Sequence, residues 1–194
     1  TEYKNKKKII FIDNYYGKKI YSLIKNKNKN KNKNKNKIKT VSLENKNADY
    51  YSSNIVYTKS GINFLVNSKY GVKQVSTKLY GEFSVTNILI TIATLVNNKA
   101  DYNFFLDNMR YIESLSGRMQ KLEKKQKPIV FIDYAHTPDA VKKVLISVKK
   151  HFPDNEITTI FGCGGDRDVS KRKIMAEIID KYSNNIIVTN DNPR

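Results

Sequence analysis

Short apolar runs and helical apolar stripes alternate along the last third of the chain. Three runs of four or five residues, typical of buried strands, lie at residues 129–132, 157–161 and 185–189. Between them, two segments carry apolar side chains every three or four residues, and the first begins with Thr137 and Pro138, a favoured start for a helix. This order of strands and helices predicts an α/β fold with a Rossmann-like parallel sheet. The side chains expected to face its core are Ala140, Val141, Val144, Leu145 and Val148, then Ile174, Met175, Ile178, Ile179 and Tyr182.

The first part of the chain also mixes strands and helices. Its strand signals are apolar runs and β-branched alternation, and its helix signals are apolar residues at intervals of three and four. The expected elements, in order, are a strand at 9–12, a helix with Tyr16, Ile20 and Ile24 on its apolar stripe, strands between 54 and 78 that turn at Gly61 and Gly71, and helices at 83–99 and 102–112.

A charged stretch separates these two parts. Residues 114–128 ("SLSGRMQKLEKKQKP") hold few apolar side chains and are typical of a connection. We therefore expect two domains, with residues 1–116 in the first and residues 117–194 in the second.

The chain is strongly basic, with 36 Lys and Arg against 18 Asp and Glu and a formal net charge of +18. Such a balance is typical of nucleic-acid binding. However, only five of the basic residues are Arg, and Lys often occurs next to Asn. Lys and Asn share A/T-rich codons, so compositional drift explains the excess better than a nucleic-acid partner does. Residues 25–37 alternate Lys and Asn without an apolar anchor, which predicts a disordered low-complexity loop.

The remaining composition indicates a cytoplasmic protein. Cys163 is the single cysteine, which excludes an internal disulfide. No stretch reaches the ~20 apolar residues of a membrane span, and the start of the chain lacks the apolar region of a signal peptide. The chain begins with Thr rather than Met, so we expect a fragment or a processed product.

Polar side chains follow each of the three predicted strands of the last third. In an open parallel sheet, ligands bind beyond the carboxyl ends of the strands. Each polar group alone has an ordinary explanation as a cap or a turn, but together they predict one site. The groups are Asp133, Tyr134 and His136 after the first strand, the glycine-rich "GCGGDRD" with Arg167 after the second, and Asp191, Asn192, Pro193 and Arg194 after the third.

Two guanidinium groups in this set suggest an anionic ligand. The planar forks of Arg167 and Arg194 suit a carboxylate or a phosphate. With the carboxylate of Asp191 and the amide of Asn192, they would suit an amino-acid zwitterion. The glycine-rich stretch differs from the G-x-G-x-x-G dinucleotide fingerprint because its third glycine comes too early.

Several stretches resemble the Mur ligase family, and within it the diaminopimelate-adding branch. The most specific are "FIDYAHTPDAV", "FGCGGDRDVSKRKIM" and "VTNDNPR", in this order and spacing. "GEFSVTNILITIATL", "SGRMQKL" and "IIFIDNYYGKKI" are similar to the family segments G-x-F-N-V-x-N, G-R-M-E and I-N-x-D-D-x-x-G. The resemblance implies that residues 1–116 are the second half of a central ATP-binding domain. It implies that residues 117–194 are the first part of a Rossmann-like C-terminal domain that binds the amino acid.

The resemblance implies an ATP-dependent amide ligase of peptidoglycan precursor synthesis that works with Mg²⁺ as a monomer. Such an enzyme joins meso-diaminopimelate to UDP-N-acetylmuramoyl-L-alanyl-D-glutamate through an acyl phosphate. The form D-N-P-R is associated with diaminopimelate, whose second carboxylate suits Arg194. The family pattern implies ATP contacts for Asn87, Arg118, Asp133, Tyr134 and His136, and amino-acid contacts for Arg167, Asp191, Asn192, Pro193 and Arg194.

The sequence also departs from the family pattern. Phe11, Asn14, Ser84 and Gln120 stand where the family has Asn, Asp, Asn and Glu. No G-T-x-G-K-T phosphate loop occurs, and by the family pattern the carbamylated lysine and the uridine-binding domain would precede residue 1. We therefore expect an internal segment that holds no metal site or catalytic residue of its own and is inactive alone.

Three alternatives stay open at this point. One is another ligase of the same superfamily, such as one that adds glutamate to folate, because the "DYAHTP" element is loosely shared with such enzymes. Another is a basic segment that binds nucleic acid through residues 25–37. The third is a decayed ligase in a drifting genome.

Overall fold

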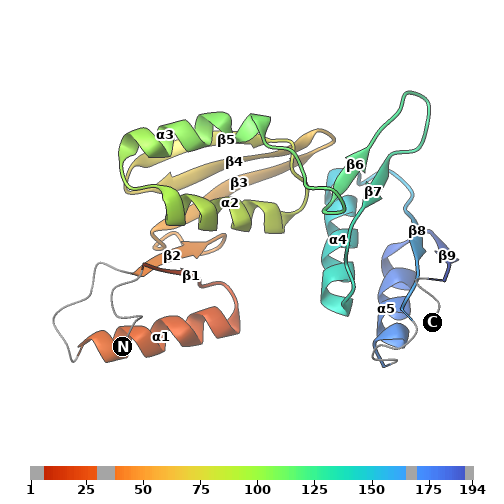
Figure 1. The fold of residues 1–194 in the computed structure, drawn as a ribbon, viewed down its shortest axis with the longest axis horizontal. Helices are drawn as coiled ribbons and strands as arrows, with labels where there is room; N and C mark the ends of the chain where they lie inside the picture. Colours follow the sequence, from red (N-terminus) through yellow and green to blue (C-terminus); the bar gives the residue numbers. More distant parts are fainter. Residues whose placement is uncertain (1–6, 30–37, 165–169, 191–194) are drawn as a thin grey trace. The chain divides into compact units, whose positions relative to one another are not determined.

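The computed structural model describes residues 7–29, 38–164 and 170–190, which form two compact units (Figure 1). The first unit holds the described residues up to 56, together with 62–78 and 82–112. The second unit holds the described residues from 113 onward and two short segments, 57–61 and 79–81. The chain therefore passes through the second unit twice before residue 113, where the main part of that unit begins.

A five-stranded sheet in the order β1-β2-β3-β4-β5 forms the centre of the first unit (Figure 1). Strands β1, β2 and β3 are parallel, and β4 and β5 form an antiparallel hairpin. Helix α2 packs on β1 and β2, and α3 packs on β5. The elements are β1 (Lys8–Phe11), α1 (Tyr15–Lys29), β2 (Ile38–Ser42), β3 (Tyr50–Thr58), β4 (Gly61–Ser68), β5 (Gly71–Thr77), α2 (Glu82–Leu95), α3 (Lys99–Asn108) and the 3-10 turn η2 (Met109–Tyr111).

The predicted strands of this unit and the turns at Gly61 and Gly71 are confirmed, and both predicted helices are found with shifted ends: the helix expected at 83–99 ends at Leu95, and the helix expected at 102–112 begins at Lys99 and ends at Asn108. Strand β2 was not predicted. Both glycines have positive φ, at 138° and 120°, a region that glycine enters without steric cost. Alternate side chains of β4 are buried because one face of the strand meets the helices. The fully buried side chains include Ile62, Phe64 and Val66 of β4 and Val85, Leu89 and Ile92 of α2.

Helix α1 differs from its prediction in length and in its buried face. It continues to Lys29, so the expectation that residues 25–37 form a disordered loop is wrong for 25–29, while 30–37 lie outside the described residues. Lysine is a good helix former, and extending an existing helix costs far less than starting one. Tyr21 and Ile24 pack on the strands, whereas the predicted Tyr16 and Ile20 are exposed.

The second unit packs two helices beside two short pairs of strands. Strands β6 and β7 form an antiparallel hairpin, and β8 and β9 pair in parallel. The core between α4 and α5 is built from Val141, Leu145, Ile157, Met175 and Ile179. The elements are β6 (Gln120–Leu122), β7 (Val130–Ile132), α4 (Pro138–His151), β8 (Thr158–Phe161), α5 (Ser170–Tyr182) and β9 (Asn185–Val188).

The predicted start of α4 is confirmed. Thr137 is the N-cap, and its hydroxyl accepts the backbone N–H of Ala140 at 3.3 Å. Pro138 occupies the first turn, and Asp139 pairs with Lys143 at 2.7 Å one turn later. These contacts satisfy the helix start and place its apolar side toward α5.

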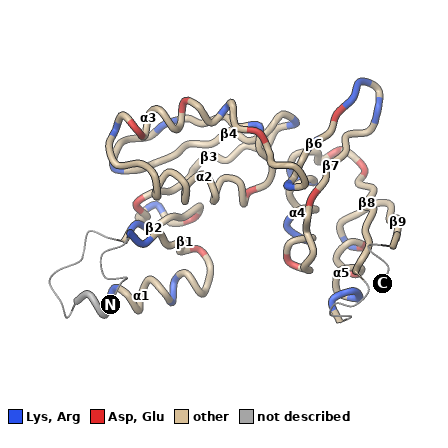
Figure 2. The backbone as a smooth tube through the Cα atoms, viewed as in Figure 1, with Lys and Arg blue, Asp and Glu red and all other residues tan. Residues whose placement is uncertain are grey.

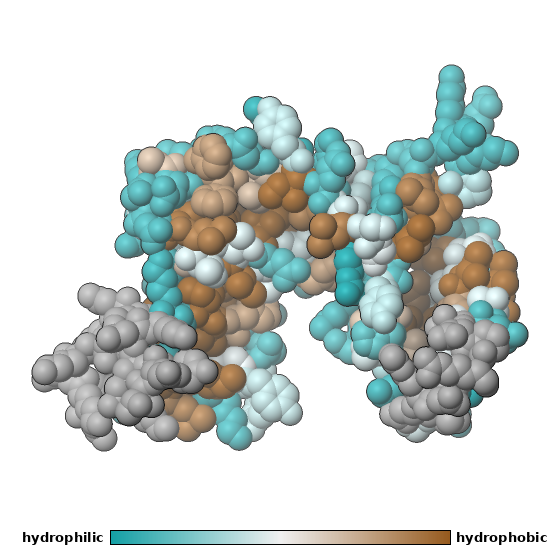
Figure 3. Space-filling model, viewed as in Figure 1, coloured by the Kyte–Doolittle hydropathy of each residue, from teal (hydrophilic) through white to brown (hydrophobic). Residues whose placement is uncertain are grey.

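Three predictions for the last third need correction. β7 was expected in one sheet with β8 and β9, but in the described residues it pairs with β6. Strand β6 was not predicted because residues 114–128 have a charged composition that is typical of a connection. Ile174 was expected in the core and is 47% exposed, because the helix turns Met175 inward instead. The apolar side chains of β9 are also exposed, and Figure 3 shows hydrophobic residues at the surface of this strand.

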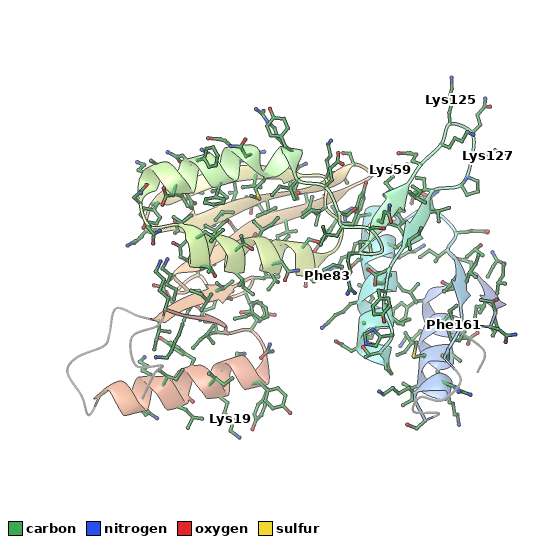
Figure 4. The ribbon with its side chains drawn as sticks, viewed as in Figure 1. Lys19, Lys59, Phe83, Lys125, Lys127 and Phe161 are labelled. Carbon is green, nitrogen blue, oxygen red and sulfur yellow. The ribbon has the colours of Figure 1, made fainter. Side chains whose placement is uncertain are left out.

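Lysines gather at the tip of the β6–β7 hairpin, as the blue segment in Figure 2 shows. Lys125 and Lys127 project from this tip into solvent (Figure 4). Solvated lysines on a short hairpin discourage edge-to-edge pairing with other strands. Over the described ranges, no helix is long and apolar enough to cross a membrane.

Candidate functional site

The β6–β7 hairpin brings two predicted site segments together. Gln120 lies opposite Ile132 in its register, so the residues before β6 and those after β7 are neighbours. The backbone confirms this, because Tyr134 N–H donates to the carbonyl of Gly117 at 2.9 Å. Arg118 therefore lies beside the Asp133–His136 segment, although fifteen positions separate Arg118 from Asp133 in the sequence.

Arg118, Tyr134 and His136 form a stack at the surface. The guanidinium carbon of Arg118 lies 5.0 Å from the centre of the Tyr134 ring, a cation–π distance. The rings of Tyr134 and His136 have their centres 5.1 Å apart. All three side chains are exposed, so a planar cation and two rings face solvent in one cluster. Such a cluster can stack on a ring and attract an anion.

Asp133 fixes the turn that carries Arg118. Its Oδ2 accepts the backbone N–H of Met119 at 2.8 Å, and the carboxylate is half-buried. A carboxylate that accepts a backbone N–H holds the loop more firmly than a neutral acceptor would. The structure thus gives Asp133 a turn-holding role, the ordinary explanation for a polar residue after a strand, and its contact with a nucleotide stays a prediction.

His136 is oriented by its own segment. Its Nδ1 lies 3.0 Å from the carbonyl oxygen of Tyr134, so Nδ1 donates a hydrogen bond to this oxygen. The adjacent N-cap Thr137 fixes the backbone from which the ring projects. The imidazole is thereby held beside Tyr134 rather than free to rotate.

The glycine-rich loop is described only as far as Gly164. Thr189 N–H donates to Phe161 carbonyl at 3.0 Å, so β8 and β9 end at the same edge of their pair. The guanidinium of Arg172 donates to the carbonyl of Gly164 at 3.0 Å, and sequence reasoning missed this anchor. A basic residue in the first turn of the helix that follows a glycine-rich loop is the signal that would have found it.

The remaining predicted site residues lie either in the first unit or outside the described residues. Asn87 is an exposed residue of α2 in the first unit. The five residues predicted to bind the amino acid lie outside the described residues: Arg167, Asp191, Asn192, Pro193 and Arg194. In the described part of the chain, no three His, Cys, Asp or Glu side chains lie together as a metal site.

Two of the sequence departures have structural roles in the described residues. Asn14, at the position of a family Asp, accepts the backbone N–H of Gly17 at 2.7 Å and fixes the start of α1. Gln120, at the position of a family Glu, accepts the backbone N–H of Gly117 at 3.0 Å. Each side chain holds a turn because its amide oxygen accepts a hydrogen bond. A carboxylate at the same position would also offer an acceptor oxygen.

Comparison with known families matches both parts of the chain. A model of the Mur ligase middle domain matches residues 1–95, and a model of the Mur ligase glutamate ligase domain matches residues 117–194. The relatives are UDP-N-acetylmuramoyl-L-alanyl-D-glutamate–2,6-diaminopimelate ligases. The one from Wigglesworthia glossinidia brevipalpis is 42% identical over 149 residues, which are 77% of this chain and 30% of that protein. The one from Buchnera aphidicola subsp. Acyrthosiphon pisum is 35% identical over 200 residues, which are 100% of this chain and 38% of that protein.

Solved structures agree with these matches. The structure of a UDP-N-acetylmuramoyl-L-alanyl-D-glutamate–2,6-diaminopimelate ligase matches with a TM-score of 0.63 and 34% identity. The match covers 97% of this chain and 37% of the ligase chain. MurF from Acinetobacter baumannii has a TM-score of 0.67 at 17% identity, which shows a shared fold alone. This chain spans about a third of the length of its curated relatives, between 29% and 38%. The chain belongs to the Mur ligase family, with residues of the middle domain followed by residues of the glutamate ligase domain.

Proposed function

We propose that this chain belongs to an ATP-dependent ligase that adds meso-diaminopimelate to UDP-N-acetylmuramoyl-L-alanyl-D-glutamate in peptidoglycan precursor synthesis. The observation that carries the proposal is the sequence match to diaminopimelate ligases along the whole chain. The cluster of Arg118, Tyr134, His136 and Asp133 supports it, because its chemistry suits a nucleotide.

Each residue of the cluster has a role in binding ATP. Arg118 neutralises phosphate charge, which matters because the attacking carboxylate is itself an anion and negative charge builds up on the leaving ADP when the γ-phosphoryl group is transferred. Asp133 holds the ribose region, and Tyr134 and His136 lie beside it. Asn87 contributes a further nucleotide contact from α2. The transfer yields an acyl phosphate, which the incoming amine then attacks.

The amino acid is bound by Arg167, Asp191, Asn192, Pro193 and Arg194. The guanidinium of Arg194 pairs with the second carboxylate of diaminopimelate, a group that lysine lacks. Arg194→Ala in the complete enzyme is therefore expected to raise the KM for diaminopimelate sharply while changing lysine use little. Unchanged diaminopimelate kinetics would remove this assignment.

The remaining expectations belong to the same proposal. Residues 1–116 contribute the second half of an ATP-binding domain, and residues 117–194 the first part of the C-terminal domain. The enzyme works as a cytoplasmic monomer with Mg²⁺. Because no G-T-x-G-K-T phosphate loop lies within the 194 residues, the isolated chain is inactive.

A pair of arginines allows a matched test of the nucleotide site. Arg110 is exposed and stacks on Tyr111 at 4.9 Å, as Arg118 stacks on Tyr134, but it belongs to the first unit. Arg118→Ala is expected to weaken ATP binding about 10- to 100-fold, the effect of losing a charge-assisted contact. Arg110→Ala is expected to change ATP binding less than about twofold, because it removes only an exposed stacked cation. Equal effects of the two variants would refute the assignment of Arg118 to the phosphates.

A further inference from the structure

Three consecutive backbone N–H groups have defined partners in the turn that carries Arg118. Gly117 N–H donates to Gln120 Oε1 at 3.0 Å, and Arg118 N–H donates to the Leu115 carbonyl at 3.0 Å. Met119 N–H donates to Asp133 Oδ2 at 2.8 Å. Two of the three acceptors are side chains, and they bind the N–H groups of the two residues that flank Arg118.

The same turn adopts an uncommon backbone conformation. Gly117 has φ of 68° and Met119 has φ of 44°, in the left-handed region that L side chains rarely adopt. Met119 is only 2% exposed, so its side chain is held by packing as well as by Asp133. A turn with two left-handed residues depends on its surroundings to keep this shape.

Gln120 holds the first half of the turn. Its Oε1 accepts the N–H of Gly117 and also lies 3.3 Å from the hydroxyl of Ser116, which donates to it. Gln120 itself is anchored in β6, opposite Ile132. The side chain therefore ties residues 116 and 117 to a strand, while Arg118 remains exposed above Tyr134.

We propose that Gln120 is a positioning residue for ATP binding, which acts by holding the 116–119 turn so that the Arg118 guanidinium is preset for phosphate. The inference rests on the proposed function, since it assumes that Arg118 meets phosphate. A preset guanidinium gives up less conformational freedom on binding, so the affinity for the anion is greater. Gln120 touches neither the nucleotide nor the reacting atoms in this account, and its effect passes entirely through Arg118.

Removing the acceptor at position 120 tests the proposal. Gln120→Met keeps the length of the side chain and removes the acceptor, and Gln120→Asn keeps the amide but shortens its reach. Both are expected to weaken ATP binding about five- to tenfold, the effect of one or two lost hydrogen bonds. Gln120→Glu retains an acceptor oxygen and is expected to stay within about twofold of the parent. Gln74→Met makes the same chemical change at an exposed position of β5 and is expected to leave ATP binding unchanged.

The decisive measurement is a double-mutant cycle with Arg118→Ala, by calorimetric titration of the full-length protein with ATP and, separately, with adenosine. If Gln120 acts through Arg118, Gln120→Met weakens ATP binding by less than about twofold when Arg118 is already alanine. The affinity for adenosine is then unchanged in all variants. Gln120→Asn must show the same small effect on ATP binding in the Arg118→Ala background. This second variant keeps the test valid if Gln120→Met does not fold.

Two results would overturn the proposal, and they are distinguishable. Equal losses from Gln120→Met in both backgrounds, or equal losses for ATP and adenosine, would mean that Gln120 only stabilises the fold. An Arg118→Ala variant that binds ATP like the parent would remove the phosphate role of Arg118, and the proposed nucleotide site would fail together with this inference.

Discussion

Replacing His151 with leucine is expected to loosen the hold of α4 on two distant segments. His151 is the last residue of that helix and is only 2% exposed. Its Nδ1 lies 2.7 Å from the carbonyl oxygen of Thr58, and Gly81 N–H donates to its Nε2 at 3.2 Å. One imidazole therefore satisfies backbone groups of both 57–61 and 79–81.

The magnitude follows from these two bonds. Leucine offers neither a donor nor an acceptor, so the half-buried carbonyl of Thr58 and the buried N–H of Gly81 would lose their partner. Each loss costs about 1–3 kcal/mol, so His151→Leu is expected to lower the free energy of unfolding by about 2–6 kcal/mol. His151→Gln can donate and accept through its amide, and it is expected to lose about half as much.

The same geometry predicts a pH dependence. Both bonds together require the neutral imidazole, because a protonated Nε2 would face the Gly81 N–H as a second donor. Burial lowers the pKa of His151, partly opposed by its bond to the Thr58 backbone. The folded state therefore binds fewer protons than the unfolded chain, whose histidine pKa is about 6.5. The stabilisation is complete above that pH and declines below it by at most about 1.4 kcal/mol per pH unit, until the folded-state pKa is reached.

Urea unfolding at pH 7.5 and pH 5.5 measures both effects in the full chain. The parent is expected to lose up to about 1.4 kcal/mol between these pH values through His151, and His151→Gln to lack this component. His136→Ala is the matched control, because His136 is the other histidine and is exposed, so its removal should leave the pH dependence in place. Identical pH dependence in the parent and in His151→Gln would refute the reasoning.

Three further substitutions test backbone space and burial. Gly17→Ala is expected to destabilise the chain by about 3 kcal/mol or more, because a Cβ there would overlap the carbonyl oxygen of Phe11. Gly164→Ala, where a Cβ meets nothing within 4 Å, is expected to change stability by less than about 0.5 kcal/mol, and equal thermal midpoints for the two variants would contradict this account. Tyr50→Phe is expected to stabilise the chain by about 1 kcal/mol, because the buried hydroxyl has no hydrogen-bond partner within the described residues and burial raises its pKa to about 12. A clear loss of stability in urea unfolding would show that this hydroxyl is satisfied.

The sequence predicted elements best where one pattern dominated. The apolar runs of β4 and α2 and the N-cap of α4 each follow from a local rule, and each is found in the structure. The end of α1 was missed because a helix that is already formed extends into Lys and Asn, which would not start one. Strand β6 was missed because three residues in a charged stretch carry no periodic signal.

Part of the candidate site was predictable and part was not. Asp133, Tyr134 and His136 were predicted because they follow a strand and lie in a stretch that resembles the family pattern. The contact between Arg118 and Tyr134 depends on the β6–β7 register, and β6 itself was not predicted. The role of His151 depends on hydrogen bonds with Thr58 and Gly81, which no sequence period relates to it. Gln120 accepts from Gly117, only three residues away, but this bond depends on the shape of a turn that the sequence did not predict.

The central claim is that this chain belongs to a diaminopimelate-adding ligase. The most direct test supplies the full-length protein with ATP, Mg²⁺ and UDP-N-acetylmuramoyl-L-alanyl-D-glutamate, and offers meso-diaminopimelate or L-lysine as the amine. The account predicts ADP release and a tripeptide product with diaminopimelate, and at least about tenfold lower kcat/KM with lysine, since Arg194 would lack its carboxylate partner. Equal or better use of lysine, or no product with either amine, would contradict it.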